Sequence, residues 1–477
     1  MQQFLSDWWW VVSGVVSITT VVVDLTAAVH LALYKRDSRA AIGWMGVILL
    51  APLIGAVLYF LFGINRIRRK ALRLRPVHPP RPDADVEPPP SPVPDHLTGL
   101  DRLVRRTTGR PLVPGNRVTP LRDGDRVYAE MTAAIRGAEH TVGLCTYIFD
   151  NDAAGRMFVD ALAAAVARGV TVRVLIDDVG RRYSWPSVVG RLRRAGVPVA
   201  RFLPQLLPWQ FTYANLRNHR KLLTVDGRVG FTGGMNIRAG HAPSLAGKHP
   251  IHDLHFKIEG PVVGQLQQVF AADWAFTTGE LLEGDGWFPP LPPAGGVAAR
   301  AVASGPDRDF EKLRTALLGA LAVARRSVRI LTPYFLPDPG LIAALNVAAL
   351  RGVEVDVVLP ERSNLRLVQW ASNGQLDQVL GSGCRVWFTP PPFDHAKLML
   401  VDGEWALIGS GNWDPRSLEL NFELDVECYD PALAGELEEM VAGVRQRARR
   451  VTTGDWSKRG LLVRLRDGVA RLFAPYL

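Results

Sequence analysis

The chain has 477 residues, about three times the length of a typical domain, so the sequence predicts more than one structural unit. With 48% hydrophobic residues it can bury a core, which excludes a globally disordered chain. Its three cysteines, Cys145, Cys384 and Cys428, are odd in number and widely spaced. This pattern excludes a disulfide scaffold and a cysteine-based zinc site, and it predicts a reduced, intracellular protein.

The net charge is +10, from 56 Lys and Arg against 46 Asp and Glu, which at first suggests a nucleic-acid partner. The location of the charge argues against that partner. Residues 1–76 contain nine basic and three acidic residues, whereas the remaining 401 residues contain 47 basic and 43 acidic residues. The bulk of the chain is therefore near neutral, and the excess positive charge lies beside the two most hydrophobic segments.

These two segments, residues 8–34 and 40–63, are each long enough to cross a membrane, which takes about 20 apolar residues. The first contains one acid, Asp24, and one histidine, His30, and the second contains no charge. Trp8 and other aromatic residues lie near the segment ends, as is typical at membrane interfaces. The alternative for each segment is a buried core helix. The sequence predicts an N-terminal transmembrane helical hairpin.

The charges around the segments predict the orientation of the hairpin. The connecting loop contains Lys35, Arg36 and Arg39, while a longer basic cluster follows the second segment: Arg66, Arg68, Arg69, Lys70, Arg73 and Arg75. Basic residues next to a span favour the cytoplasmic side, so the loop and the cluster argue in opposite directions. The longer cluster predicts a multi-pass protein of the cell membrane with both termini in the cytoplasm. The same cluster is expected to attract anionic membrane lipid.

The rest of the chain contains an internal repeat. The sequence from His219 through Lys221, Asp226 and Gly233 to Asn236 recurs, with matching spacing, from His395 through Lys397, Asp402 and Gly409 to Asn412. Further upstream, residues 168–174 pair with residues 351–357, and each follows an Ala- and Leu-rich helical stretch. Helix, turn and strand therefore occur in the same order twice. The repeat predicts two α/β halves with a mixed sheet each.

The spacing within the repeat suggests a shared site. In a strand, residues two apart face the same side, so His219 should lie beside Lys221, and His395 beside Lys397. One such motif alone is more often an exposed polar edge, and the Asp-Gly pairs that follow are ordinary turn signals. Two matching copies favour a functional site, because two equivalent halves can bring all four side chains together.

Two lysines and two imidazoles make a cationic pocket suited to a phosphodiester without a metal or any other cofactor, since ammonium groups repel a divalent ion. One neutral histidine can attack phosphorus while the other, protonated, donates to the leaving alkoxide. The lysines and the two asparagines, Asn236 and Asn412, can stabilise charge on the phosphate oxygens.

These residues resemble the phospholipase D superfamily, defined by two H-x-K-x4-D motifs, and more closely its bacterial cardiolipin synthases. The resemblance runs nearly from end to end, including residues 39–66, 304–307, 332–335 and 409–423. It implies transfer of a phosphatidyl group between two phosphatidylglycerol molecules through a phosphohistidine, giving cardiolipin and glycerol. It also implies six catalytic residues: His219, Lys221, Asp226, His395, Lys397 and Asp402. Asn236 and Asn412 would lie near the phosphate, and Asp253 and Glu423 would each orient the histidine of the opposite half.

The resulting organisation is a membrane hairpin with a basic juxtamembrane segment, a Pro-rich linker, two phospholipase D-like α/β lobes related by pseudo-twofold symmetry, and a C-terminal basic amphipathic helix. The boundaries expected for these parts are 1–75, 76–98, 99–295, 296–455 and 456–477. For the last part, a helix lying on the membrane and a plain docked helix are equal alternatives.

Two other functions fit the same motifs. A phospholipase D-type hydrolase or another phosphatidyltransferase would share the covalent step and differ only in what attacks second. A nucleic-acid phosphodiesterase is disfavoured by the near-neutral charge beyond residue 76 and by the membrane segments. The sequence leaves the oligomeric state open.

Overall fold

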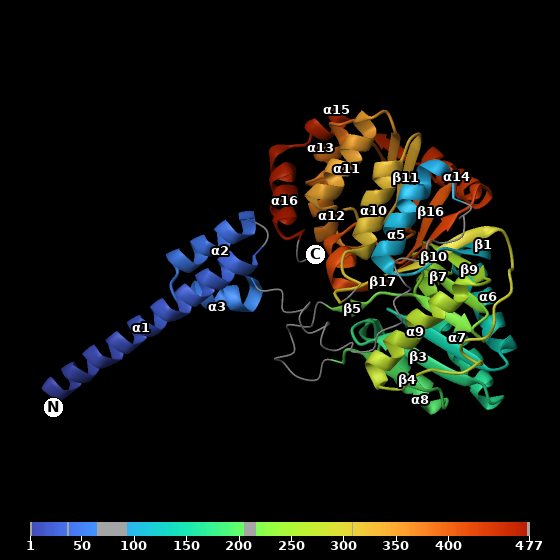
Figure 1. Ribbon diagram of the computed structural model, residues 1–477, viewed down its shortest axis with the longest axis horizontal. Coiled ribbons are helices and arrows are strands. Elements are labelled where there is room, and N and C mark those ends of the chain that lie inside the picture. The colour runs from blue at the N-terminus through green and yellow to red at the C-terminus, as the bar shows by residue number, and fades with distance from the viewer. Residues whose placement is uncertain (1, 36–37, 64–92, 205–215, 308, 475–477) are drawn as a thin grey trace. The chain divides into compact units, whose positions relative to one another are not determined.

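The computed structural model describes residues 2–35, 38–63, 93–204, 216–307 and 309–474, and the chain divides into two units, residues 1–70 and 71–477 (Figure 1). The first unit is helical, and the second contains the described strands. The basic cluster at 66–75 and most of the predicted Pro-rich linker lie outside the described residues.

The first unit consists of α1 (Gln2–Tyr34), α2 (Ser38–Leu50), α3 (Ile54–Leu58) and a π-helical turn, Tyr59–Gly63. Helix α1 is continuous through the apolar stretch Trp8–Tyr34, whose 27 residues are enough to cross a membrane. Among the described residues it is the one helix with the length and apolar composition to do so.

The second predicted span, residues 40–63, does not form one helix in the structure. The helix stops after Leu50 and starts again at Ile54, with Pro52 between them. Proline has no N–H to donate, and its ring collides with the preceding helical turn, so it breaks a helix interior. Leu53 has a φ of 63°, which turns the chain sharply. With only 13 residues, α2 is shorter than a span requires, and the expected two-span hairpin is not seen.

The second unit is an α/β fold built on a large mixed β-sheet. The N-terminal half has strand order β1-β9-β7-β6-β2-β3-β4, and the C-terminal half has order β10-β17-β16-β15-β11-β12-β13-β18. The neighbours β2, β3 and β4 are parallel, as are β11, β12 and β13, and the other neighbours are antiparallel. The two halves therefore repeat one strand order, as the sequence repeat predicts.

The strands of the first half are β1 (Val113–Arg122), β2 (Thr141–Thr146), β3 (Thr171–Asp177), β4 (Val199–Phe202), β6 (Leu222–Val225), β7 (Val229–Gly233) and β9 (Leu254–Glu259). Those of the second half are β10 (Val297–Ser304), β11 (Ser327–Leu331), β12 (Glu354–Pro360), β13 (Arg385–Thr389), β15 (Leu398–Val401), β16 (Trp405–Gly409), β17 (Asn421–Tyr429) and β18 (Arg449–Val451). Three short strands complete the set: β5 (Arg217–Asn218), β8 (Ile251–His252) and β14 (Phe393–Asp394).

The two halves share one sheet instead of having one sheet each. Strand β1 is ten residues long, and its two ends pair with different neighbours. Its beginning pairs with β10 of the second half, and Arg117–Arg122 pairs with β9 of its own half. The predicted lobes, 99–295 and 296–455, therefore lie edge to edge within a single compact unit.

Helices cover the sheet (Figure 1): α5 (Thr98–Thr108), α6 (Asp123–Gly137), α7 (Ala153–Ala167), α8 (Val188–Arg194), α9 (Val262–Thr278), α10 (Lys312–Val323), α11 (Pro339–Leu350), α12 (Arg366–Asn373), α13 (Leu376–Leu380) and α14 (Pro431–Gln446). One buried apolar cluster belongs to the first half and another lies mainly in the second. A third cluster contains Phe256 and Phe270 from the first half together with Leu398 and Phe422 from the second. Because burial of apolar surface is the main driving force of folding, this shared core stabilises the junction of the halves.

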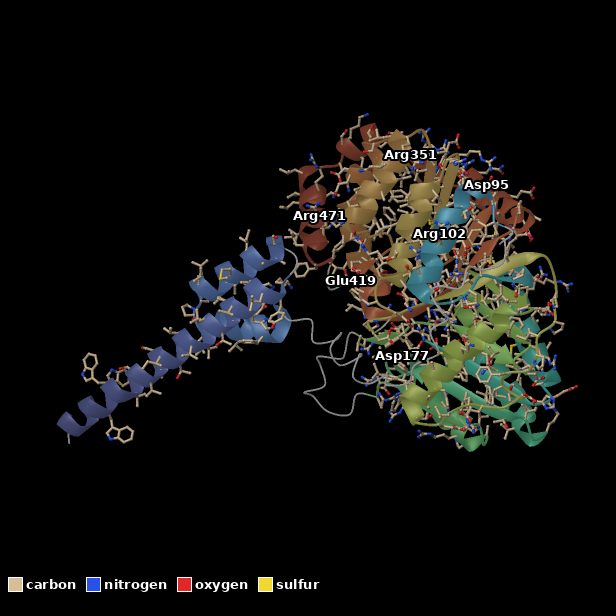
Figure 2. All side chains as sticks on the ribbon, viewed as in Figure 1. Asp95, Arg102, Asp177, Arg351, Glu419 and Arg471 are labelled. Carbon is tan, nitrogen blue, oxygen red and sulfur yellow. The ribbon has the colours of Figure 1, made fainter. Side chains whose placement is uncertain are left out.

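The predicted C-terminal segment forms α15 (Thr453–Ser457) and α16 (Leu461–Leu472), the helix that carries Arg471 (Figure 2). One face of α16 packs against α12, with Ala470 buried. Another face exposes Leu461 and Leu462, at 77% and 81%. The helix is thus docked on the fold and still presents apolar side chains outward.

Candidate active site

Both H-x-K motifs lie where the chain crosses between the two halves. Strand β5 pairs with β17 of the second half, whereas β6, three residues later, pairs with β2 and β7 of the first. His219 and Lys221 occupy the short crossing between β5 and β6, outside the strand expected to contain them. The backbone N–H of His219 still donates to the carbonyl of Phe422, at 2.9 Å. The motif is therefore held at the junction of the halves.

The second motif repeats this arrangement. Strand β14 pairs with β8 of the first half, and β15 then pairs with β11 and β16 of the second. His395 and Lys397 lie in the crossing between β14 and β15, and the N–H of His395 donates to the carbonyl of His252, at 2.7 Å. Each half thus extends a two-residue strand into the other, so both motifs lie at one junction.

A buried hydrogen-bond network fixes the first crossing. Arg220, 1% exposed, donates to both carboxylate oxygens of Asp273 at 2.6 and 2.7 Å, and to the carbonyl of Glu423 at 3.0 Å. Asp177, at the end of β3 and labelled in Figure 2, accepts from the N–H of Asn218, at 2.9 Å. Loss of either partner of a buried ion pair is strongly destabilising, so this network strongly restricts movement of the segment.

Each histidine is held by an acid from the opposite half, as the family resemblance implies. The Nδ1 atom of His219 lies 3.0 Å from both carboxylate oxygens of Glu423. The Nδ1 atom of His395 lies 2.8 Å from Oδ2 of Asp253. A neutral imidazole that donates through Nδ1 carries its lone pair on Nε2, so these bonds leave the Nε2 lone pair free in both rings.

The two acids differ in their surroundings. Glu423 also accepts from the hydroxyls of Ser410 and Ser417, at 2.6 and 2.8 Å, and from the amide of Asn421, at 3.1 Å. Burial by itself would raise the pKa of Glu423, but His219, Lys221 and Ser410 outweigh it and lower the pKa to about 2. Glu423 is therefore a carboxylate at neutral pH.

Asp253 has fewer donors. Its carboxylate accepts from its neighbour's N–H, that of Leu254, at 2.8 Å, besides the ring of His395. Burial raises the pKa of Asp253, although the charge of Lys397 opposes the change. Asp253 is therefore closer than Glu423 to gaining a proton.

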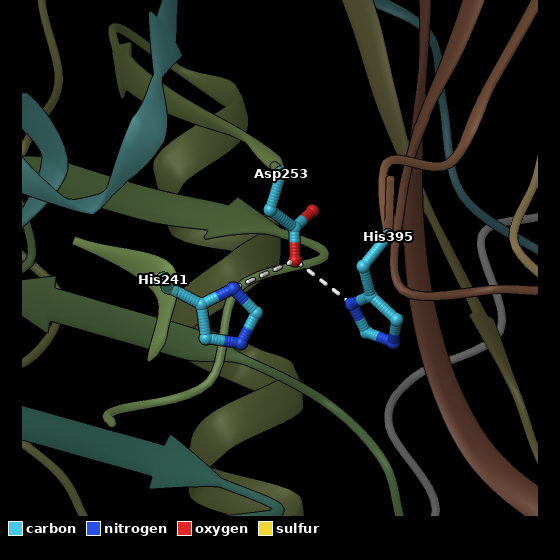
Figure 3. Close-up of side chains that lie close together, drawn as sticks. All are labelled: His241, Asp253 and His395. Atoms are coloured by element: carbon cyan, nitrogen blue, oxygen red, sulfur yellow. Dashed lines mark hydrogen bonds and ion pairs between the residues drawn. The ribbon is translucent and has the colours of Figure 1, made fainter. Parts of the chain in front are cut away.

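A third histidine, His241, shares Asp253 (Figure 3). Its Nδ1 atom lies 3.5 Å from Oδ2 of Asp253, and its ring centroid lies 5.9 Å from that of His395. Burial lowers the pKa of His241 to about 3, so its ring is neutral. The sequence analysis missed this residue because it has no counterpart in the repeat, and only the fold brings it to Asp253.

His241, Asp253 and His395 each offer a ligand atom within 4.8 Å of the others, a spacing that could hold a metal ion. The charge on neighbouring Lys397 opposes such an ion, since it acts on both Asp253 and His395. In addition, Oδ2 of Asp253 already bonds to the ring of His395. The prediction of a metal-free site therefore stands as a prediction.

The lysines are buried beside the histidines. The ammonium of Lys221 donates to the carbonyl of His219 at 2.5 Å, and that of Lys397 donates to the carbonyl of His395. Burial lowers the pKa of Lys221 to about 7 and that of Lys397 to about 8, against the opposing charges of Glu423 and Asp253. Both ammonium groups are therefore poised to gain stability from an anion.

Both imidazoles are neutral at neutral pH. Burial lowers the pKa of His219 to about 4, although the charge of Glu423 opposes this change. Burial, together with the charges of Lys397 and Lys221, lowers the pKa of His395 well below its usual value. A neutral histidine beside two cations is suited to attack an electrophilic, negatively charged group.

The two asparagines are not equivalent. Oδ1 of Asn236 accepts from the N–H of Ile148 at 3.1 Å. Oδ1 of Asn412, in a residue only 4% exposed, has no hydrogen-bond partner among the residues that the structure describes. Asn412 lines a small cavity together with Lys397 and Asp425. Burial and the charge of Glu423 raise the pKa of Asp425 to about 8. Sequence reasoning missed Asp425, which lies two residues beyond Glu423 in β17.

Asp226 and Asp402 do not join this cluster. At about 3.3 Å per residue, the seven extended residues from His219 to Asp226 span roughly 20 Å. The Asp226 carboxylate accepts from the backbone N–H groups of residues 139–141, at 2.7 to 3.0 Å. Asp402 accepts in the same way from residues 325–327, at 2.7 to 2.9 Å. Both acids, with φ of 50° and 57°, begin tight turns and anchor the start of a parallel strand.

We therefore expect Asp226→Asn and Asp402→Asn to affect stability more than chemistry. Asparagine tolerates a positive φ but loses the charge that strengthens three hydrogen bonds, for a cost of about 1–3 kcal/mol. Thermal unfolding in detergent should shift to lower temperature, while turnover per folded molecule stays within about tenfold of the wild type. The matched control, His219→Gln, should show the opposite pattern: the unfolding temperature should not change, and turnover should be lost. A large loss of turnover in both Asp variants without a change in unfolding would place these acids in the catalytic step.

Comparison with known proteins agrees with this geometry. The family model described as "Cardiolipin synthase, PLD-like domain" matches residues 131–274 and 317–444, one match in each half. A second model, "Phospholipase D-nuclease N-terminal", matches residues 22–63. Among solved structures, a phosphatidylserine synthase from Haemophilus influenzae superposes with a TM-score of 0.62 at 13% identity, and the match covers 79% of this chain and all of that one. At this identity the likeness concerns the fold alone.

Similar proteins match over almost their whole length. A cardiolipin synthase from Geobacillus kaustophilus is 33% identical, and the match covers 94% of this chain and 91% of the relative. Cardiolipin synthase A from Pseudomonas entomophila is 33% identical over 95% of this chain and 96% of its own. The major cardiolipin synthase ClsA of Bacillus subtilis is 31% identical over 93% of this chain and 95% of its own. The chain therefore belongs to the cardiolipin synthase family of the phospholipase D superfamily.

Proposed function

We propose that the protein is a phosphatidyltransferase that makes cardiolipin and glycerol from two molecules of phosphatidylglycerol through a phosphohistidine. One observation carries the proposal: two histidines of a duplicated motif meet at a buried junction beside two lysines, each held at Nδ1 by an acid of the opposite half. Membership of the cardiolipin synthase family supports the same activity. The repeated strand order supports a pseudo-twofold axis relating the halves.

His219 is the nucleophile. Its neutral ring attacks phosphorus through Nε2, the P–N bond forms, and the P–O bond to the departing glycerol breaks. The attack makes the ring cationic, and the carboxylate of Glu423, fixed by two hydroxyls and an amide, stabilises that charge. The low pKa of Glu423 supports this assignment, because a carboxylate that stays ionised is the better partner for a phosphorylated imidazole.

His395 is the acid and then the base. It gives its proton to the departing glycerol oxygen, and later removes the proton from the primary hydroxyl of the second phosphatidylglycerol, whose oxygen attacks phosphorus and releases His219. Burial and two lysines lower the pKa of His395 and so disfavour its protonated form. A bound phosphodiester brings a negative charge that offsets the lysines, so substrate binding itself favours the protonated acid. Asp253, whose pKa is raised, suits a pair that exchanges protons.

The remaining polar groups hold the phosphate. Lys221 and Lys397 place their ammonium groups beside the histidines that they follow, and Asn412 has an unpaired amide oxygen whose amide can turn toward a ligand. We propose that Lys221, Lys397, Asn236 and Asn412 bind the non-bridging oxygens, with no metal or cofactor. The apolar helix α1 supports attachment to the cell membrane, where the anionic lipid substrate resides. The basic cluster that follows the last apolar segment supports a location of residues 71–477 in the cytoplasm.

The purified full-length enzyme in detergent micelles, given labelled phosphatidylglycerol, should produce cardiolipin and free glycerol in equal amounts. The same result is expected with a divalent-metal chelator present. Phosphatidic acid as the main product would identify a hydrolase instead. Complete loss of activity with chelator, restored by one specific divalent ion, would contradict a metal-free site.

Single substitutions distinguish the roles proposed for His219 and His395. We expect His219→Ala to abolish both cardiolipin formation and the covalent adduct, a loss of at least about 10³-fold. His395→Ala should lose nearly as much turnover with phosphatidylglycerol, because the glycerol oxygen leaves poorly without a proton. It should still form the adduct with a phosphatidyl p-nitrophenol, whose leaving group needs no proton. Mass spectrometry of the trapped enzyme checks both outcomes. An adduct on His395 that persists in the His219→Ala variant would show that His395 is the nucleophile and His219 the acid and base.

The lowered lysine pKa values predict an unusual pH dependence of anion binding. The charged form of a lysine exists below its pKa, so a pKa of about 7 for Lys221 and about 8 for Lys397 means that the site loses charge across this range. The dissociation constant of sulfate, which does not titrate here, should rise tenfold or more between pH 6 and pH 8, measured by calorimetry in detergent. Ordinary lysines titrate near pH 10.4, so a constant value up to pH 9 would contradict the prediction. Lys221→Ala should weaken binding at pH 6 and flatten the dependence.

A further inference from the structure

The apolar segment 38–63 turns back on itself instead of continuing in one direction. Helix α2 and the α3 segment pack against each other so closely that a Cβ atom on Gly55 would lie 2.3 Å from the carbonyl oxygen of Val47. Only glycine fits this contact. The turn at Ala51–Leu53 therefore connects two antiparallel arms, neither of which is long enough to cross a membrane.

The tip of this turn is bonded to the middle of α1. The N–H of Leu53, which has no helical partner after the break at Pro52, donates to Oδ1 of Asp24, at 2.9 Å. In a hydrocarbon environment an unsatisfied backbone group costs several kcal/mol, and a carboxyl group in a span is rare unless it has a partner. Each group thus supplies the partner that the other requires, which accounts for the one acid in the predicted first span.

Both ends of the segment 38–63 lie near Tyr34, the C-terminal end of α1. Its start, Ser38, follows Tyr34 after a short connection. Its end is tied to the same place, because the ammonium of Lys35 donates to the carbonyl of Gly63 at 3.0 Å. Between tip and end, Nδ1 of His30 lies 2.9 Å from the hydroxyl of Tyr59.

The dimensions agree with insertion to half depth. At 1.5 Å per residue, Trp8–Tyr34 is about 40 Å long, more than the ~30 Å hydrocarbon core of a bilayer. Asp24 lies ten residues before Tyr34, about 15 Å along the helix, which is half of that core. Figure 1 shows α2 and α3 beside the later part of α1, with its first part uncovered by the rest of this unit. The N-terminal family model, residues 22–63, begins just before Asp24 and matches the same packed group.

We propose that α1 is a single membrane span and that residues 38–63 form a re-entrant pair of half-helices, which enters and leaves the bilayer on the side of Lys35. The N-terminus then lies outside the cell, and everything from Lys35 onward, apart from the re-entrant pair, lies in the cytoplasm. Lipid covers the exposed part of α1, whose residues Trp8, Trp9 and Trp10 are 58%, 72% and 75% exposed. The inference rests on the membrane attachment proposed above but not on the reaction.

This topology removes the conflict in the charges. The nine basic residues among residues 1–76 all follow Tyr34 in the sequence. A two-span hairpin would place Lys35, Arg36 and Arg39 outside the cell and the cluster after Gly63 inside. With a re-entrant pair, the chain leaves the membrane next to Lys35. All nine basic residues then lie on the cytoplasmic side. The positive-inside rule is then satisfied without exception.

Cysteine labelling in intact cells tests which parts of the chain lie outside the cell and which lie in the cytoplasm. The three native cysteines are buried, so single cysteines can be added to the full-length enzyme. With a membrane-impermeant maleimide, Gln3→Cys should react in intact cells, whereas Ser38→Cys and the exposed control Ser457→Cys should react only after permeabilisation. Reaction of Ser38→Cys without Gln3→Cys in intact cells would overturn the proposal in favour of two spans. If none of the three added cysteines reacts before permeabilisation, α1 does not cross the membrane. That result would also overturn the proposal.

Crosslinking tests the fold-back itself. His30→Cys with Tyr59→Cys should crosslink with a short bifunctional thiol reagent, because the two side chains meet in the structure. The matched control is Val15→Cys with Tyr59→Cys. In a straight two-span hairpin centred on residues 35–39, Tyr59 would lie beside Val15 and far from His30. Crosslinking of the control pair alone would overturn the proposal, and neither result depends on whether the enzyme transfers or hydrolyses.

Discussion

The carboxylate–imidazole bonds that cross between the two halves are the constraint on which the active site depends. Neither half contains a complete pair, because the acid that orients each histidine comes from the other half. The pairings of β5 with β17 and of β14 with β8 bring each histidine to the acid of the other half, and β1, which pairs with β10 and β9, links the halves within one sheet. Catalytic geometry and the association of the halves are therefore one physical problem.

The pseudo-equivalent pairs have unequal chemistry. Burial raises the pKa of both acids, but Glu423, with its hydroxyl and amide donors and nearby His219 and Lys221, has a lowered pKa. The pKa of Asp253, which is shared by His395 and His241, stays raised. A duplicated site with identical halves could not assign one histidine to attack and the other to proton transfer. The donors around each acid differ between the copies, and this difference supports the roles proposed for the two histidines. Burial also lowers the pKa values of both lysines, so an anion beside them would stabilise their charged forms.

In the N-terminal unit, two polar groups that would each be costly in an apolar environment bond to each other. They are the carboxylate of Asp24 and the backbone N–H of Leu53. Pro52 leaves a backbone N–H without a helical partner, and Asp24 supplies the acceptor. In a sequence, a carboxyl group within an apolar run appears only as a reduction in hydropathy. In the structure the same carboxylate accepts from the N–H of Leu53, at the turn of the second apolar segment.

The sequence alone was sufficient for the features that depend on local pattern and on repetition. The two motifs, their order in two α/β halves, and the apolar helix ending at Tyr34 are confirmed, because strand and helix periodicity and the repeat are properties of the chain itself. Three features were decided by tertiary structure. The break at Pro52 cancels a span that hydropathy predicts, since hydropathy does not register a missing N–H. Asp226 and Asp402 match the motif but bond to backbone N–H groups distant in sequence, which only strand packing brings near. His241 and Asp425 reach the site without any motif, because the contacts that place them connect residues far apart in the chain.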